Sequence, residues 1–378
     1  MESDYLIVGS GLTGAVIARK LEDAGKSVLV LDRRSHLGGN VHDHTHASGI
    51  RVHTYGPHYF RTNSGEVWQF VNRFAEFYKY EATVKSFVDG VYENWPVAGD
   101  YLRRIAGKDW RPAFTGRPAN FEEASLAMMS ATVYEKFVKG YTEKQWGVPA
   151  HTLSTNLARR FDVRADDEPR LVRHRFQGLP KDGYAGLMSN LLAGIRVVLN
   201  CDYLRHKEEF SAREGIIFTG PIDEFFGCDL GRLKYRGQKR DQEFLPGIDF
   251  AQPCAQVNNP DPANGSHLRT LEWKHLMESA DARRISGTVL TRETAITPAD
   301  ANDFEYPFPD AANAQLYAAY RERAQKIPGL LICGRLGEYR YYDMDQAIAR
   351  AMMLAKGLLN DRRGSRRKML LTHGHSGN

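Results

Sequence analysis

Two short stretches of the sequence concentrate aromatic and charged side chains. Residues 334–344 read GRLGEYRYYDM and combine three tyrosines, two arginines and two acids directly before an expected helix. Residues 140–147 read GYTEKQWG and end a helical pattern. Aromatic rings stack on planar bases, and guanidinium groups pair with phosphate oxygens. Tyr141, Trp146, Arg335 and Tyr341 are therefore candidates to meet an aryl base and phosphates.

No motif in the sequence supplies a protein nucleophile. Ser/His/Asp and Cys/His sets are absent by pattern, and His58 with Arg61 lies beside a Gly-Pro turn, where a histidine is often structural. The four cysteines are too far apart for a CxxC pair, so we expect reduced thiols in a cytoplasmic protein. The reactive centre is then expected to be a cofactor.

Three histidines alternate along one segment, His42, His44 and His46. On a strand they would share a face and could bind a metal ion. Spacing points to no carboxylate or cysteine partner, so an exposed hairpin is the simpler interpretation. We predict no metal.

The first forty residues predict the unit that would hold a cofactor. A strand at 4–8 runs into the GxGxxG stretch 9–14, a helix at 15–24 follows, and a second strand at 27–31 ends at Asp32. Such a βαβ unit binds a dinucleotide: glycines let the backbone approach the pyrophosphate, and the acid accepts from a ribose. Asp32 disfavours NADP, although Arg33 and Arg34 weaken that argument.

Six residues beyond Asp32 the sequence reads Gly38-Gly39-Asn40. An acid followed at this distance by Gly-Gly resembles the extended FAD fingerprint of glutathione-reductase-like flavoproteins. Alone, the Gly-Gly pair would be a turn. Together with the preceding unit it shifts the predicted cofactor from NAD to FAD.

Composition bounds the class of protein. The 378 residues are 42% hydrophobic and 26% charged, which is typical of a globular chain with two or three domains. No apolar run approaches the ~20 residues that span a bilayer. Of the net charge of +5, about +4 lies in the tail 361–378, which we expect to be disordered. The remainder gives no case for nucleic acid.

At GYTEKQWG and YRYYDM the chain resembles the bacterial UDP-galactopyranose mutases. Other matching stretches are 8–12, 38–40, 177–180 and 218–223, so the resemblance spans residues 4 to about 358. It implies an isomerase of the cytoplasm, usually a homodimer, that interconverts the pyranose and furanose forms of a UDP-sugar without net oxidation. It also implies that FAD acts reduced, its N5 attacking the anomeric carbon and holding the sugar as an adduct.

The resemblance implies an α/β fold in three parts. We predict a discontinuous FAD-binding, Rossmann-like domain at 1–65, 185–235 and 328–360. An inserted, mainly helical substrate domain is predicted at 66–184, with a mobile loop at 157–173. An antiparallel β-sheet domain is predicted at 236–327.

The family's site residues carry over position by position. The predicted catalytic set is Arg160 and Arg269 for the diphosphate, His58 near the flavin ring, and Arg61. The predicted substrate-binding set is Phe137, Tyr141, Thr142, Trp146, Asn258, Tyr306 and Tyr341. The predicted FAD-binding set is Gly9, Gly11, Leu12, Thr13, Gly14, Asp32, Arg33, Gly39, Asn40, His58, Arg335, Asp343 and Met344.

Two positions depart from the family pattern. Arg61 stands where a second histidine is usual, and Leu171 where a phosphate-binding tyrosine is usual in the mobile loop. Arginine is longer and richer in donors, so Arg61 could hydrogen-bond a C2 acetamido carbonyl. UDP-N-acetylgalactosamine therefore joins UDP-galactose as a predicted substrate. The alternatives are an FAD oxidoreductase of the amine-oxidase type and a binding protein that has lost turnover.

Overall fold

A five-stranded parallel sheet carries the N-terminal unit. The computed structural model describes residues 2–104 and 111–360. The strand order is β10 (Arg196–Val198), β2 (Val28–Leu31), β1 (Glu2–Val8), β11 (Ser211–Phe218) and β17 (Leu330–Ile332). β1 is central, with Leu6 opposite Leu29 on one side and Ile216 on the other. The order reverses beside β1, and ligands bind at the carboxyl ends of strands at such a point.

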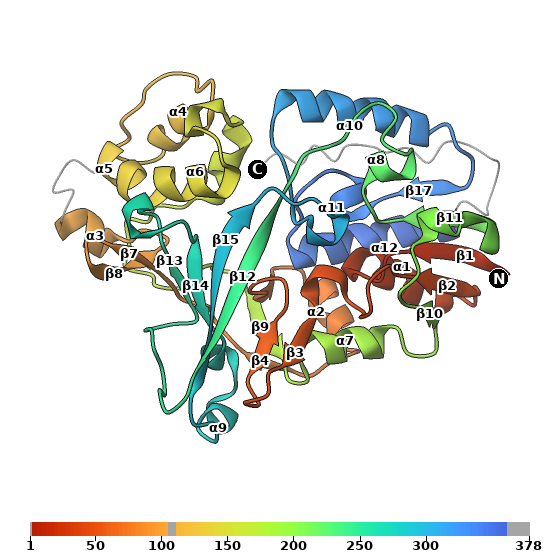
Figure 1. Ribbon diagram of the computed structural model, residues 1–378, viewed down its shortest axis with the longest axis horizontal. Helices are drawn as coiled ribbons and strands as arrows, with labels where there is room; N and C mark the ends of the chain where they lie inside the picture. The colour runs from red at the N-terminus through yellow and green to blue at the C-terminus, as the bar shows by residue number, and fades with distance from the viewer. Residues whose placement is uncertain (1, 105–110, 361–378) are drawn as a thin grey trace.

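Helices cover this sheet because their apolar sides are buried against it. α1 (Leu12–Glu22) packs on α12 (Met344–Asn360) and on α7 (Gly183–Leu191), bringing segments from the start, middle and end of the chain together (Figure 1). The other short helices of this region are α2 (Gly65–Val71), α8 (Ile222–Phe225) and α11 (Gly334–Gly337). The predicted fold class, an α/β Rossmann-like domain with helical and antiparallel parts, is confirmed.

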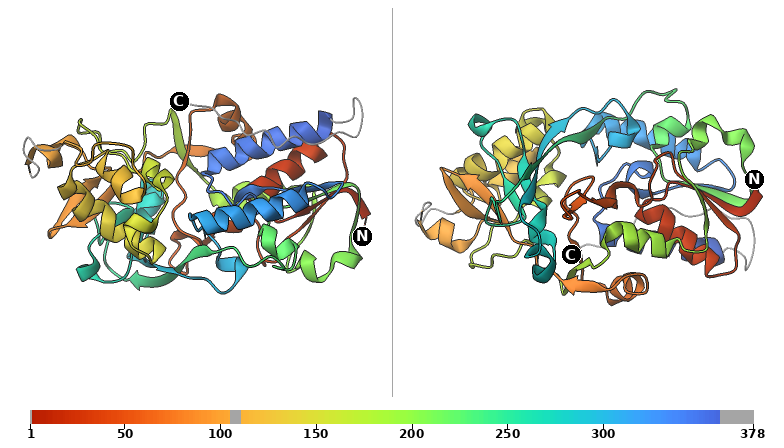
Figure 2. Two further views of the ribbon diagram at one scale, coloured as in Figure 1. Left: turned by 90° about the horizontal axis from the view of Figure 1, so that it is seen from above. Right: turned by 60° about the horizontal axis from the view of Figure 1, so that its bottom comes forward.

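A seven-stranded sheet crosses the middle of the molecule. Its order is β16 (Tyr306–Pro307), β12 (Tyr235–Leu245), β15 (Thr288–Ile296), β14 (Arg269–Glu272), β13 (Gln256–Asn258), β7 (Val84–Val88) and β8 (Val91–Trp95). Only the β13–β7 pair is parallel. Figure 2 shows this sheet between the Rossmann end and a helical end of the elongated molecule.

The helical end holds a continuous helix of changing geometry. α5 (Ala131–Val133) runs into a π-helical segment, Tyr134–Lys139, and then into α6 (Gly140–Trp146). Around it lie α3 (Gly99–Arg104), α4 (Phe121–Leu126) and the 3₁₀ turns Ala150–Thr152 and Thr155–Arg160. Asn120 caps α4 by accepting from the Glu123 N–H at 3.0 Å, as its sequence predicts.

Smaller sheets complete the described part of the chain. β3 (Asp43–Thr45) and β4 (Arg51–His53) form a hairpin, and β5 (Phe60–Thr62), β9 (Phe176–Pro180) and β6 (Phe77–Lys79) form a three-stranded sheet. The short helix α9 is Ser279–Ala282. Within residues 2–104 and 111–360, no helix is long and apolar enough to cross a membrane. The predicted disordered tail, 361–378, lies outside the described residues.

The structure adds detail to two of the predicted domains, whose boundaries stay predictions. The segment 66–184 contains strands β6 to β9 as well as helices, and β7 and β8 extend the seven-stranded sheet. The sequence does not predict β7 because its buried residues, Val84, Ser86 and Val88, alternate over only five positions. The helix α10 (Ala311–Ala324), predicted within the sheet domain, contacts α8 and β17 because it leads directly into that parallel strand.

Candidate active site

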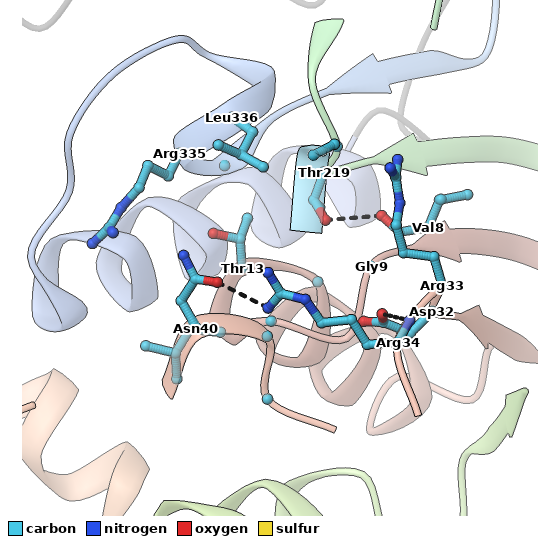
Figure 3. Close-up of a pocket in the computed structure, with 18 of the residues that line it drawn as sticks. Val8, Gly9, Thr13, Asp32, Arg33, Arg34, Asn40, Thr219, Arg335 and Leu336 are labelled. Atoms are coloured by element: carbon cyan, nitrogen blue, oxygen red, sulfur yellow. Dashed lines mark hydrogen bonds between the residues drawn. The ribbon is translucent and has the colours of Figure 1, made fainter. Parts of the chain in front are cut away.

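A first cavity lies at the carboxyl ends of β1, β2 and β11. Val8, Asp32 and Thr219 line it from these strand ends, and the start of α1 lines its floor. Arg335 and Leu336 reach it from the C-terminal part of the chain (Figure 3). The predicted FAD-binding residues that line this cavity are Gly9, Gly11, Leu12, Thr13, Gly14, Asp32, Arg33, Gly39, Asn40, His58, Arg335 and Met344.

The glycines of this cavity allow close backbone approach. A Cβ on Gly14 would lie 2.0 Å from the carbonyl oxygen of Gly9, and a Cβ on Gly39 would lie 3.1 Å from the Gly11 Cα. Gly9 has φ of +106°, and Gly38 and Gly39 also have positive φ, a region that glycine favours. Free N–H groups of the first turn of α1 complete a cradle that fits a pyrophosphate. The residues therefore fit the predicted dinucleotide.

Asp32 has its carboxylate fixed by the loop it faces. Its Oδ2 accepts from the Ser10 N–H at 2.7 Å and from the Ser10 hydroxyl at 2.6 Å, while Oδ1 accepts from the Arg34 N–H at 2.9 Å. Oδ1 keeps acceptor capacity for a ribose hydroxyl. Arg33 is held by an ion pair with Glu224 at 2.9 Å.

His58 lines the same cavity in one defined tautomer. Its Nδ1 lies 2.7 Å from the carbonyl oxygen of Gly56, and because a carbonyl only accepts, Nδ1 carries the proton. Burial, with Arg335 and other nearby arginines, lowers the pKa of His58 to about 3. The ring is therefore neutral near pH 7, and its Nε2 is an acceptor.

The second cavity lies between α6 and the seven-stranded sheet. It is lined by aromatic and cationic side chains from elements far apart in the sequence. Eight predicted residues line it together: Phe137, Tyr141, Thr142, Trp146, Arg160, Asn258, Arg269 and Tyr306. Sequence reasoning missed Trp95, Phe121, Gln145, Leu157, Phe161 and Gln256, which complete the lining. Gln145 lay inside the GYTEKQWG stretch, and Leu157 and Phe161 lay inside the predicted loop 157–173.

Arg269 belongs to a group of four largely buried charges, together with Glu293, Arg240 and Glu305. Glu293 accepts from Arg269 Nε at 2.5 Å and from Arg240 Nε at 2.8 Å, and Arg240 also pairs with Glu305 at 2.8 Å. Burial would raise the pKa of Glu293, but attraction to Arg269 and Arg240 lowers it. Burial alone would lower the pKa of Arg269, and Glu293 raises it well above its ordinary value. Arg269 is therefore a fixed cation. Sequence reasoning missed Arg240, Glu293 and Glu305 because their spacing follows no local motif.

Tyr341 connects the two cavities. The guanidinium carbon of Arg160 lies 4.4 Å from the Tyr341 ring centre, and that of Arg335 lies 4.6 Å from it. The ring also stacks on Tyr306 at 5.9 Å between centroids. Since Arg160 lines the second cavity and Arg335 the first, this column joins the two sites.

Three predicted site residues, Arg61, Tyr341 and Asp343, belong to neither lining set. Arg61 pairs with Asp343, with Nη2 3.1 Å from Oδ2, and the Tyr341 hydroxyl donates to the other Asp343 oxygen at 3.3 Å. Asp343 therefore faces an arginine and a tyrosine, and its contact with the flavin stays a prediction. Leu171 packs at the margin of the main apolar core, and its N–H donates to the Ala82 carbonyl at 2.7 Å.

The alternating histidines lie on the β3–β4 hairpin and its approach. His42 and His44 contact the Thr54 hydroxyl oxygen, at 2.9 and 3.1 Å, while His46 contacts Ser48. In the part of the chain that the structure describes, no group of three or more metal-ligating side chains could hold an ion. The segment forms the hairpin that the simpler interpretation predicted.

The fold and the first cavity define a Rossmann-type flavoprotein, with a second cavity suited to a nucleotide. A family model described as UDP-galactopyranose mutase matches residues 136–341, and one described as an NAD(P)-binding Rossmann-like domain matches residues 7–74. A probable UDP-galactopyranose mutase from Klebsiella pneumoniae is 32% identical over 94% of this chain and 95% of its own. A dTDP-fucopyranose mutase from Escherichia coli is 30% identical over 93% of this chain and 97% of its own.

The chain belongs to the UDP-galactopyranose mutase family, and it is an isomerase with a flavin cofactor. A crystal structure of reduced UDP-galactopyranose mutase has a TM-score of 0.72 at 14% identity, covering 94% of this chain and 95% of that one. A putative protoporphyrinogen oxidase from Exiguobacterium has a TM-score of 0.61 at 12% identity, covering 94% and 98%. At such identities both likenesses show the fold alone.

Proposed function

We propose that this chain interconverts the pyranose and furanose forms of UDP-galactose, UDP-N-acetylgalactosamine or both, with reduced FAD as the nucleophile and no net oxidation. The observation that supports this most directly is the column of Arg335, Tyr341 and Arg160. It brings an aromatic and cationic cavity next to the flavin cavity, which suits a reaction at a sugar carbon held between nucleotide and cofactor.

The residues of the second cavity suit the two halves of a UDP group. Phe137, Tyr141 and Trp146 offer ring faces and edges for the uridine and the sugar side. Arg160 and Arg269 offer two cations for two phosphates. Because Arg269 uses Nε for Glu293, its two terminal nitrogens stay available for phosphate oxygens. Tyr306 lies beside them and can donate its hydroxyl.

Bound FAD, when reduced, would supply an N5 lone pair able to attack an anomeric carbon. The protein's part is to keep its own groups in the right protonation state beside that carbon. His58 is neutral, so it adds no positive charge and presents Nε2 as an acceptor at the cavity wall. Arg160 and Arg269 would hold the departing diphosphate close for its return.

Arg61 supports the choice of an acetamido sugar. Its ion pair with Asp343 uses one of five N–H donors, so others can meet a C2 acetamido carbonyl if the sugar reaches this side of Tyr341. The relative named dTDP-fucopyranose mutase carries a different nucleotide and sugar in its name. The sugar is therefore the part of the proposal that most needs a direct test. The homodimer, the cytoplasmic location and the mobility of 157–173 stay predictions.

The experiment is anaerobic turnover of the purified holoprotein with dithionite-reduced flavin. UDP-galactose, UDP-N-acetylgalactosamine and dTDP-fucose are supplied separately, and products are resolved by chromatography. We expect a new isomer from at least one UDP-sugar, and only with reduced flavin. Arg61→His should lower turnover of the acetamido sugar and spare that of UDP-galactose. An isomer formed equally well with oxidised flavin contradicts the mechanism. In a parallel aerobic assay with oxidised flavin, oxygen uptake with a substrate would favour the weaker oxidoreductase alternative.

A further inference from the structure

The cofactor cavity has one wall from outside the Rossmann-like domain. The connection between β15 and β16 contains the 3₁₀ turn Ala301–Asp303, and Ala301 and Asn302 line the cavity. Both flanking strands belong to the seven-stranded sheet. The sheet that carries Arg269 therefore also reaches the cofactor.

Two contacts hold this connection against the cofactor loop. Arg34 Nη2 donates to the carbonyl oxygen of Asn302, and Asn40 Nδ2 lies 3.4 Å from that of Phe304. Arg34 also donates from Nη1 to Asn40 Oδ1 at 2.8 Å, a bond that Figure 3 shows, and its guanidinium lies 4.4 Å from the Tyr55 ring centre. Asn302 is thus fixed through residues that themselves line or flank the cofactor cavity.

The side-chain Oδ1 of Asn302 is buried and has no hydrogen-bond partner among the described residues. The turn does not need this side chain for capping, because Asp300 Oδ1 already accepts from the Asn302 N–H at 2.7 Å. A buried acceptor without a donor costs stability, so a group that stays there calls for a partner. Asn302 lines the cofactor cavity, so bound FAD, whose ribose hydroxyls and adenine amino group donate, can supply that partner once the amide turns toward the cavity.

We propose that Asn302 is an FAD-binding residue, whose side-chain amide accepts a hydrogen bond from a hydroxyl or amino group of the cofactor and ties the sheet to the Rossmann-like domain. The same connection continues into Glu305 and Tyr306. The Glu305 carboxylate binds Arg240, its carbonyl accepts from Arg335 Nη1 at 3.3 Å, and Tyr306 lines the second cavity. FAD that holds Asn302 therefore also steadies the wall of the second cavity. By linkage, FAD and UDP each raise the affinity for the other.

The test measures FAD binding to apoprotein prepared from wild type, Asn302→Ala and the control Asn72→Ala. Asn72 is exposed just after α2, and its side chain donates back to the Trp68 carbonyl of that helix at 2.8 Å. We expect Asn302→Ala to bind FAD about tenfold more weakly by flavin-fluorescence titration, the effect of one lost hydrogen bond, and Asn72→Ala to match wild type. The melting temperature of the Asn302→Ala apoprotein should equal or exceed that of wild type, because the variant removes an unpaired acceptor.

A purely structural asparagine would give the opposite pattern. FAD affinity of Asn302→Ala within about twofold of wild type overturns the proposal. So does an apoprotein destabilised enough to account for the whole loss of FAD affinity. A second measurement titrates UDP: we expect wild-type holoprotein to bind it more tightly than apoprotein, and the difference to shrink in Asn302→Ala. None of these measurements uses turnover, so they stand or fall apart from the proposed reaction.

Discussion

The two cavities hold their residues in place by different means. The cofactor cavity uses backbone: three glycines at the β1–α1 turn, the N–H groups of α1 and a Gly-Gly turn pressed against Gly11. The second cavity uses side chains from α6, β13, β14 and β16, with a buried ion group behind Arg269. A site built from closely packed backbone loses its ligand when a side-chain atom is added to one of its glycines. A site built from side chains loses its ligand when a charged group loses its partner or its anchor.

The largest effect is expected at Gly14, where space decides. In Gly14→Val the new Cβ would lie 2.0 Å from the Gly9 carbonyl oxygen, so the cofactor turn must move. We expect the free energy of FAD binding to become less favourable by about 3 kcal/mol or more. This change corresponds to an FAD affinity that is at least roughly 100-fold weaker. Gly65→Ala is the control, since a Cβ there meets nothing within 4 Å. If Gly14→Val retained FAD after gel filtration, the backbone account of this cavity would be wrong.

The second prediction contrasts neighbouring arginines in the side-chain site. Both arginines are exposed, but Arg160 lines the second cavity and lies over Tyr341, whereas Arg159 lines neither cavity. We expect Arg160→Ala to lower kcat/KM about 30-fold, near 2 kcal/mol for a lost charge-assisted bond to phosphate, with FAD affinity unchanged. Arg159→Ala should keep wild-type kinetics. Equal losses in both variants would mean that general positive charge, and not the cavity, attracts the substrate.

The third prediction concerns the stability of the protein in acid and the buried histidine His53, which lies next to His58 of the first cavity. Burial, followed by nearby His58, lowers the pKa of His53 to about 3 from 6.5, so the unfolded chain binds the proton first. Above pH 6.5 the neutral His53 leaves the free energy of unfolding at its full value. Below pH 6.5 the unfolded chain gains a proton that the folded chain does not, so the free energy of unfolding decreases as the pH falls toward 3. At pH 5.5 the loss is about 1.4 kcal/mol.

His53→Asn removes the titrating group and keeps an acceptor for the backbone N–H of His58, which in the wild type donates to His53 Nδ1 at 3.0 Å. Urea unfolding at pH 7.5 and 5.5 should therefore show a smaller loss of stability in His53→Asn than in wild type. His151→Asn, on the surface, should behave as wild type. An unchanged pH dependence in His53→Asn would show that burial of a neutral His53 does not cause the loss of stability in acid.

The same contrast explains what the sequence could predict. Gly9 to Asp32 form one contiguous pattern, because a backbone cradle is built from neighbours in the chain, so periodicity and spacing alone predicted a dinucleotide site there. Arg160, Asn258, Arg269 and Tyr306 meet only through the fold. They were predicted from the family resemblance, and nothing local marks them.

Other features were beyond sequence reasoning for physical reasons. Glu293 and Glu305 look like ordinary acids in the sequence, and only their burial against Arg240 gives them a role. β7 pairs in parallel with β13, which lies about 170 residues later, so no local signal places it in that sheet. Arg61 was noticed as unusual, but its partner Asp343 lies 282 residues away.

The smallest effect is expected at Lys144, inside a motif whose lysine had no assigned role. Lys144 Nζ donates to the carbonyls of Asn259 at 2.5 Å and His267 at 2.9 Å, so the loop between Asn258 and Arg269 folds around it. In Lys144→Met this anchor of α6 to the loop is lost. We expect UDP to bind about fivefold more weakly, near 1 kcal/mol, with FAD affinity unchanged.

Lys139→Met is the matched control, because its ammonium pairs at 3.0 Å with exposed Glu135 on the same helix. Calorimetric titration with UDP separates the two variants. If Lys144→Met bound UDP as wild type does, the loop would be held by the sheet alone, and the side-chain site would depend on fewer anchors than its geometry indicates. If it lost FAD as well, the two cavities would share an anchor, and the contrast between a backbone site and a side-chain site would need to be redrawn.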